Sequence, residues 1–202
     1  MAKFCWLAIF TATLVWSGIE PKDSFTWALE VAPALIALFI LTISYRRFPL
    51  TSLLYTLILI HSVILMIGGH YTYAEVPAFD WLAEQFGWQR NHYDKLGHFA
   101  QGFVPAMVAR ELLLRHHVIT KPNWLNSIIV FVCLGISAFY ELIEWWVAEL
   151  SGEDAEAFLG TQGYVWDTQS DMAMAMIGAI VALLSLGRIH QGQLKLIRQG
   201  GS

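Results

Sequence analysis

Residues 91–103 read Asn-His-Tyr-Asp-Lys-Leu-Gly-His-Phe-Ala-Gln-Gly-Phe and begin an otherwise apolar segment that continues to about Leu114. A helix of that length can cross a bilayer of about 30 Å, at about 1.5 Å per residue. Spacings of three and four residues put Asp94, His98, Gln101 and Pro105 on one face of this helix. Polar groups inside a membrane are costly unless they are paired or coordinated, so this face is expected to meet polar partners from other spans.

The composition is that of an integral membrane protein. Of the 202 residues, 56% are hydrophobic and only 14% are charged, which is unlike a soluble globular domain. The net charge of -4 and the scattered basic residues argue against nucleic acid as a partner. Cys5 and Cys133 both lie in apolar segments, without CxxC or zinc spacing. Residues 1–199 are read as a single membrane domain, and residues 200–202, Gly-Gly-Ser, as a linker-like tail.

The apolar pattern predicts an all-α fold, a bundle of six transmembrane helices. The expected spans are Phe4 to Ile19, Trp27 to Tyr45, Leu50 to Gly69, Asp94 to Leu114, Leu125 to Ala148 and Asp167 to Gly187. The first segment is short for a span, and Glu30 and Pro33 interrupt the second.

A short amphipathic helix is expected on the outer membrane interface between the third and fourth spans. It would begin at Pro77 and stop before Gly87, with Trp81 and Trp88 at the depth of the lipid headgroups. Its apolar face would comprise Phe79, Leu82, Ala83 and Phe86. The pattern leaves open whether this helix only covers the mouth of the bundle or gates it.

The distribution of lysine and arginine predicts an orientation, because cytoplasmic loops carry the excess of these residues. Nine lie on the side of both termini: Lys3, Arg46, Arg47, Arg110, Arg115, Lys121, Arg188, Lys195 and Arg198. Three lie on the other side: Lys22, Arg90 and Lys95. Both termini are therefore expected in the cytoplasm, with an acidic last outer loop that contains Glu149, Glu153, Asp154 and Glu156.

This topology brings polar side chains from four spans to one depth in the outer half of the membrane. They are Asp94, His98 and Gln101, then Ser137, Tyr140, Glu141 and Glu144, then Asp167 and Asp171, and His70 from the third span. Lys95 is the one permanent cation expected among them. The acids must therefore be protonated or hold a bound cation. Nearby glycines, Gly68, Gly69, Gly97 and Gly102, either leave room for a ligand or let helices pack closely.

We expect a divalent metal at this cluster. The candidate ligands are His98, Asp94, Glu141, Glu144, Asp167 and Asp171, with His70 as a further ligand. Carboxylates combined with histidine suit zinc, manganese or iron, and all-oxygen coordination would suit calcium or magnesium. The alternative is a His-Asp-Glu network that only locks the helices together.

Three other polar residues of the apolar segments receive separate interpretations. His61 is read as a core histidine near the middle of the membrane, and Glu111 as one partner of an ordinary ion pair with a neighbouring arginine. Glu30 either lies at the interface or joins the cluster. The pattern does not choose between these two positions.

Three motifs carry a resemblance to known membrane proteins: Asp94-Lys95-Leu96-Gly97-His98-Phe99, Glu141 to Trp146, and Asp167-Thr168-Gln169-Ser170-Asp171. Together they resemble the YjdF family of bacterial inner-membrane proteins, over the whole chain. The resemblance implies an inner-membrane protein and no particular reaction.

The second half is also similar, more distantly, to VanZ-like membrane proteins. Their signatures are D-K-x-x-H, E-x-x-Q and D-x-x-x-N-x-x-G. The matching residues here are Asp94, Lys95 and His98, then Glu141, then Asp171 and Gly178. Glu144 stands where the second signature has glutamine, and Ala175 where the third has asparagine.

Three classes of function are compatible with these residues. The first is a metal-dependent enzyme that acts on a lipid or envelope intermediate, with Glu144 and Asp94 as catalytic carboxylates. Its amphipathic substrate would come from the outer leaflet, past an aromatic rim that also anchors the protein in membrane lipids. The second is an ion-binding transporter, and the third is a structural, non-catalytic membrane protein. No polar path to the cytoplasmic half is apparent, which argues against transport.

Overall fold

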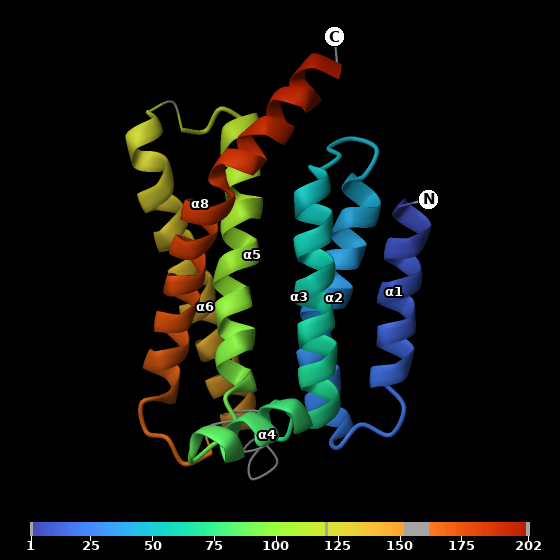
Figure 1. Cartoon of the computed structure of the whole chain (residues 1–202), viewed down its shortest axis with the longest axis vertical. Coiled ribbons are helices and arrows are strands. Elements are labelled where there is room, and N and C mark those ends of the chain that lie inside the picture. Colours follow the sequence, from blue (N-terminus) through green and yellow to red (C-terminus); the bar gives the residue numbers. More distant parts are fainter. Residues whose placement is uncertain (1, 120, 152–161, 201–202) are drawn as a thin grey trace.

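The computed structural model describes residues 2–119, 121–151 and 162–200, and this part of the chain is all helical, without a strand (Figure 1). Its helices are α1 (Ala2–Ser17), α2 (Ser24–Ser44), α3 (Ser52–Tyr71), α4 (Pro77–Phe86), α5 (Tyr93–Arg115), α6 (Pro122–Ser151) and α8 (Asp167–Gly200). The predicted all-α class is confirmed. Four of them, α2, α3, α6 and α8, are long and apolar enough to cross a membrane. The α1 helix is shorter, and α5 carries charged residues in its first and last turns.

Each expected apolar segment overlaps one helix, although three of them extend one or two residues beyond it, and the largest difference in bounds is at the last segment. The α8 helix continues past the expected end at Gly187 as far as Gly200. Hydropathy falls at Arg188, but a helix needs only its backbone hydrogen bonds and a packing partner to continue. In this extension Leu194 is buried, and Gln193 accepts a hydrogen bond from the backbone N–H of Leu53 at 3.0 Å.

The helices form two packed groups. In one group α5 packs extensively on α8, and α6 packs on both. In the other group α2 and α1 each pack on α3. The groups meet mainly where α3 contacts α5 (Figure 1). The candidate site lies at this junction.

The α4 helix lies across the end of the bundle opposite both termini (Figure 1). It begins at Pro77 and is terminated by Gly87, whose φ of 67° lies in the left-handed region that glycine adopts without strain. These bounds confirm the predicted short helix. None of its residues is fully buried, and Phe79 contacts the ring of Tyr93 at a centroid distance of 5.1 Å. It therefore packs against the end of the bundle through the ring of Phe79.

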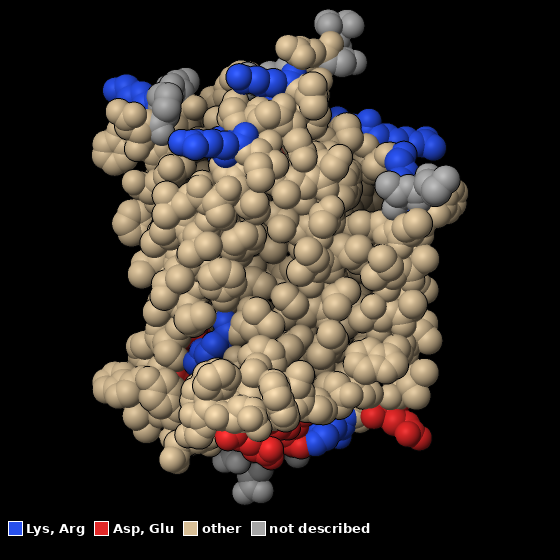
Figure 2. Space-filling model, in the orientation of Figure 1, with Lys and Arg blue, Asp and Glu red and all other residues tan. Residues whose placement is uncertain are grey.

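Charged residues separate towards the two ends of the molecule. Figure 2 shows Lys and Arg gathered at the end that carries the termini, most of the visible Asp and Glu at the α4 end, and an apolar belt between them. At the α4 end the exposed Lys22 and Glu75 form an ion pair. Three members of the expected acidic loop, Glu153, Asp154 and Glu156, lie outside the described residues.

Glycine lets α5 and α8 approach closely. A Cβ atom at Gly102 would collide with the backbone of Ala175, and one at Gly178 would collide with the backbone carbonyl of Phe99. Gly68 and Gly97 likewise face the ring of Tyr73, which fills the space beside both. At Gly68 and Gly102 close packing, and not room for a ligand, accounts for the missing side chain.

We predict that Gly102→Ala destabilises the protein, whereas Gly135→Ala in α6 does not. The added methyl group at residue 102 must push apart two backbones, and overpacking of this kind costs about 1–3 kcal/mol. At Gly135 the corresponding position has no atom of the described chain within 4 Å. Thermal unfolding of the two purified variants in the same detergent is the measurement. Equal melting temperatures would contradict the α5–α8 contact.

Candidate functional site

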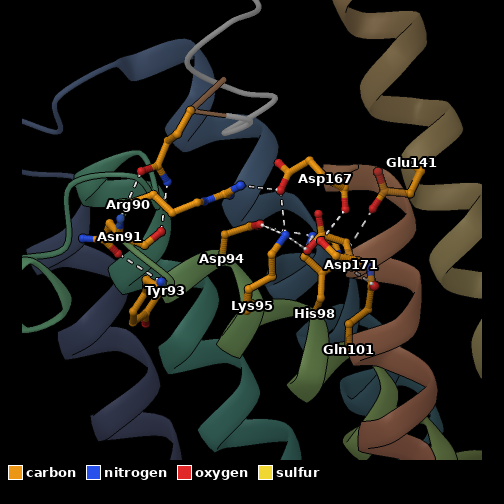
Figure 3. A network of polar contacts seen from close by, with 12 residues as sticks. Arg90, Asn91, Tyr93, Asp94, Lys95, His98, Gln101, Glu141, Asp167 and Asp171 are labelled. Carbon is orange, nitrogen blue, oxygen red and sulfur yellow. Dashed lines mark hydrogen bonds and ion pairs between the residues drawn. The ribbon is translucent and has the colours of Figure 1, made fainter. Parts of the chain in front are cut away.

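The first turns of α5 present the polar face expected from the sequence (Figure 3). Nε2 of His98 lies 3.3 Å from Oδ1 of Asp94, and its Nδ1 lies 3.2 Å from Oε1 of Gln101. The helix starts here because the side chain of Asn91 accepts a hydrogen bond from the backbone N–H of Tyr93 at 3.0 Å. Asn91 also donates to the carbonyl of Val76. The segment that leads into α4 and the start of α5 are thereby held together.

Two cations neutralise the aspartates of α8. Nζ of Lys95 lies 2.7 Å from Oδ1 of Asp167, 2.5 Å from Oδ1 of Asp171 and 3.5 Å from Oδ2 of Asp94 (Figure 3). Arg90 adds a second contact to Asp167 at 2.8 Å. The expectation of Lys95 as the one nearby cation is therefore wrong. Arg90 precedes the apolar segment, so the sequence indicates only a loop residue. The tertiary structure places its guanidinium beside Asp167 of α8.

Asp94, His98 and Asp171 form the compact part of the cluster. One ligand atom from each lies within 4.8 Å of the other two, which makes this group the candidate metal site among the described residues. Glu141 lies beside it, with Oε1 at 3.8 Å from Nδ1 of His98 and without a hydrogen-bond partner in the described chain. Asp167 is ion-paired with both Arg90 and Lys95. Of the expected ligands, Glu141, Glu144 and Asp167 thus lie outside the three-residue group.

His70 is not brought to the cluster. Its Nδ1 lies 3.0 Å from the carbonyl oxygen of Ser17, and its ring lies beside that of Trp16 at a centroid distance of 4.7 Å. His70 therefore faces α1. The physical reason is helical phase: His61 lines the site, and nine residues are about two and a half turns at about 3.6 residues per turn. The two histidines consequently point in opposite directions from α3.

A cavity of about 200 Å³ opens beside His98, where the two helix groups meet. It is lined by Glu30 and Pro33 of α2, His61 and Leu65 of α3, Tyr73, then Asp94, Gly97, His98, Gln101 and Pro105 of α5, and Ile136, Tyr140 and Glu144 of α6. The four residues of the predicted α5 face all contribute to this lining. Glu30, whose position the sequence left open, joins the site. Its Oε2 accepts from the hydroxyl of Tyr140 at 3.5 Å, across the space between α2 and α6.

A second, shallower pocket lies on the other side of the ion pairs. It is lined by Arg90, His92, Lys95, Tyr164, Ser170, Ala173 and Met174. Figure 2 shows Lys or Arg atoms set back in a hollow of the apolar belt, close to the acidic end. Burial lowers the pKa of His92, and the neighbouring Arg90 and Lys95 lower it further, so this histidine adds no third positive charge at neutral pH.

A separate buried network lies towards the end that carries the termini. Glu111, which is 0% exposed, accepts from Nη1 of Arg115 at 2.8 Å, from the hydroxyl of Thr51 at 2.8 Å and lies 2.9 Å from Nε2 of His190. The expected ion pair is present, whereas Arg110 bonds to His190 instead. His190 lies in the unexpected extension of α8, so no pattern in the sequence pointed to it. The network ties the start of α3 to α5 and α8.

Comparison with known proteins identifies relatives that match most of the chain. Residues 2–192 match the family described as "Predicted membrane protein (DUF2238)". The chain is 50% identical over 185 residues to the inner membrane protein YjdF of Escherichia coli (strain K12), which covers 92% of this chain and 88% of that protein. No solved structure matches. The expected resemblance to the YjdF family is confirmed, and the distant one to VanZ-like proteins stays a prediction.

We predict that Lys95→Met strongly destabilises the protein. Removing one partner of a buried ion pair leaves uncompensated charge and costs about 3–5 kcal/mol. Lys22→Met is the matched control, because the exposed Lys22–Glu75 pair contributes at most about 1 kcal/mol. Melting temperatures in detergent give the comparison. Adding Asp171→Asn to Lys95→Met should restore part of the loss, and equal effects of the two lysine substitutions would contradict the role of Lys95.

Proposed function

Because the chain belongs to the DUF2238 family of predicted membrane proteins, we propose that it is a six-span protein of the bacterial inner membrane, with both termini in the cytoplasm. The support comes from α1, α2, α3, α5, α6 and α8, which run lengthwise through the molecule with α4 across one end (Figure 1). Both termini lie at the end where Lys and Arg gather (Figure 2). A relative with 50% identity is an inner membrane protein. In this arrangement α5 spans the membrane with its polar face turned towards the other helices.

Single cysteines should report this orientation. In a Cys5→Ser background we expect an impermeant thiol reagent, added to intact spheroplasts, to label Gln85→Cys on α4. The same reagent should label Asn123→Cys, at the start of α6, only after the cells are broken open. Both positions are exposed, and the remaining Cys133 is buried. The reverse pattern would overturn the proposed topology.

Asp94, His98 and Asp171 hold a divalent metal in the proposed site. The supporting observation is that their ligand atoms lie within mutual reach of one ion. The contact between Nδ1 of His98 and Gln101 leaves Nε2 directed at Asp94, and such an outer hydrogen bond is what orients a metal-bound histidine. One nitrogen and two carboxylates suit zinc, manganese or iron best, and calcium or magnesium would rely on the carboxylates alone.

The reaction that this site suits best is metal-assisted hydrolysis or group transfer on an amphipathic lipid or envelope intermediate. The observation that carries the proposal is the cavity, because Asp94, His98 and Glu144 all line it. The metal would polarise a phosphoryl or carbonyl oxygen or activate water. Glu144 would accept the proton of the attacking group, and Asp94 would hold both the metal and the imidazole. A substrate enters from the outer half, since these residues lie towards the α4 end.

A structural role is the second candidate, and a specific observation favours it. Lys95 and Arg90 already offset the charge of Asp167 and Asp171, so the network can stabilise the α5–α8 pair without a metal. Transport has less support. An apolar cluster that includes Leu54, Met107 and Ile129 contributes a core of fully buried side chains to the bundle, and Glu111 lies in a network of its own.

Elemental analysis of the purified protein tests the metal centre. We expect about one divalent ion per chain in the wild type, near-complete loss in His98→Ala and full retention in His70→Ala. The second variant is the matched control, since His70 faces α1. Extraction of the ion by a chelator should also lower the melting temperature, because the acids would then face each other without it. A metal-free wild-type protein, or equal metal content in both variants, would favour the structural role.

A further inference from the structure

The cavity beside His98 has an unbalanced set of charges. Three carboxylates line it, from Glu30, Asp94 and Glu144, while no lysine or arginine of the described chain does. The nearest permanent cations, Lys95 and Arg90, are directed at the aspartates of α8 and line the other pocket. Nε2 of His98 lies 3.3 Å from Oδ1 of Asp94 and is the partner of that carboxylate. Glu30 and Glu144 therefore remain as the two carboxylates of the cavity that make no ion pair within 4.0 Å among the described residues.

Of these two glutamates, Glu144 has the fewer contacts with other polar groups. It is only 8% exposed, and no hydrogen bond or ion pair joins its carboxylate to any other part of the described chain. Glu30 is 6% exposed on the opposite wall, where the phenol of Tyr140 reaches it at 3.5 Å. A buried carboxylate without a partner is costly unless it is protonated, and a positively charged group that enters from outside the chain would supply the missing partner.

The size and the walls of the cavity specify which kind of cation fits. A volume of about 200 Å³ exceeds the cavity of about 150 Å³ that is enough for benzene, so it admits a small organic group and is far larger than a bare ion requires. Apart from the carboxylates, the lining is mainly apolar, with Leu65 and Ile136 among its residues. Tyr73 and Tyr140 add aromatic rings. Carboxylates together with aromatic faces are the chemistry that recognises an alkylammonium group.

The packing of the helices provides a place for an apolar tail. Glu30 belongs to α2, which packs on α3, and Glu144 belongs to α6, which packs on α5 and α8. The two walls thus come from helices that do not pack closely on each other within the described chain. Both helices expose large apolar side chains, such as Phe39 and Phe139, as lipid-facing helices do. A headgroup between α2 and α6 can therefore keep its tail in the surrounding lipid.

We propose that this cavity binds the ammonium headgroup of an amphipathic amine, held between the carboxylates of Glu30 and Glu144. The inference rests on the substrate site proposed above and names the class of its substrate. The amine stays intact in this binding step, so no bond is made or broken. The bond that reacts would lie on the side of the headgroup that faces His98.

Isothermal titration of the purified protein in detergent, with hexylammonium chloride and 1-hexanol as probes, tests this inference. The two probes share a tail and differ in charge. We expect the wild type to bind hexylammonium at least tenfold more tightly than hexanol. Equal affinities would overturn the proposal. This comparison uses the wild type alone and stays valid even if a variant fails to fold.

Glu144→Gln should lower the affinity for hexylammonium at least tenfold and leave that for hexanol unchanged. Glu84→Gln, at an exposed carboxylate on α4, is the matched control and should change neither. Equal effects of the two substitutions would overturn the role of Glu144. In nanodiscs, weaker hexylammonium binding in phosphatidylethanolamine than in phosphatidylglycerol would assign the ammonium to a lipid headgroup. Equal binding in the two would assign it to a free amine.

The outcome separates this inference from the proposed chemistry. Protein that prefers hexylammonium but contains no metal would support the amine site and overturn the metal centre. Protein that holds its metal at His98 but binds both probes equally would support the metal centre and overturn the amine site.

Discussion

The ammonium group of Lys95 is the charge on which the arrangement of the polar end depends. It joins α5 to α8 through Asp167 and Asp171, at 2.7 and 2.5 Å, and reaches Asp94 at 3.5 Å on its own helix. Several buried carboxylates would repel each other without such a partner, because desolvated charges cost several kcal/mol each. Arg90 completes the compensation. These pairs leave His98 free to face Asp94, Gln101 and the cavity.

The same pair of helices is held by a second constraint, the absence of side chains at Gly102 and Gly178. Backbone meets backbone at both positions, so α5 and α8 cannot rotate or slide without breaking ion pairs and close contacts together. The junction between α2 and α6 is the opposite case, because the cavity lies between them. The α5–α8 contact holds Asp94, His98 and Asp171 in place, and the loosely packed side between α2 and α6 suits entry of the proposed ligand from lipid.

The two polar regions of the protein serve different purposes. At the end of the termini, Glu111 is enclosed by Thr51, Arg115 and His190, and every contact is made within the chain. At the α4 end, one oxygen of Glu141 has no hydrogen-bond partner in the described residues, and Glu144 lines the cavity. A satisfied network stabilises helices, whereas unsatisfied carboxylates on a cavity wall offer binding capacity to something outside the chain. Chemistry is therefore expected only at the α4 end.

By itself the sequence determined the features that depend on a single helix and its ends. The shared face of Asp94, His98 and Gln101 and the common direction of Asp167 and Asp171 result from about 3.6 residues per turn. Pro77 and Gly87 set the bounds of α4, and the family was recognisable from the same motifs. Local patterns are sufficient here because each depends only on neighbours along the chain.

Tertiary structure alone decided which helices meet and with which face. It brought in Glu30 and Arg90, turned His70 towards α1 and gave Glu111 a histidine partner from the extension of α8. The rotation of each helix about its own axis is set by packing. On α3 the directions of His61, which lines the site, and His70, which faces α1, differ by about half a turn. Hydropathy specifies that a segment is apolar, but it does not specify which contact between two helices has the lowest free energy.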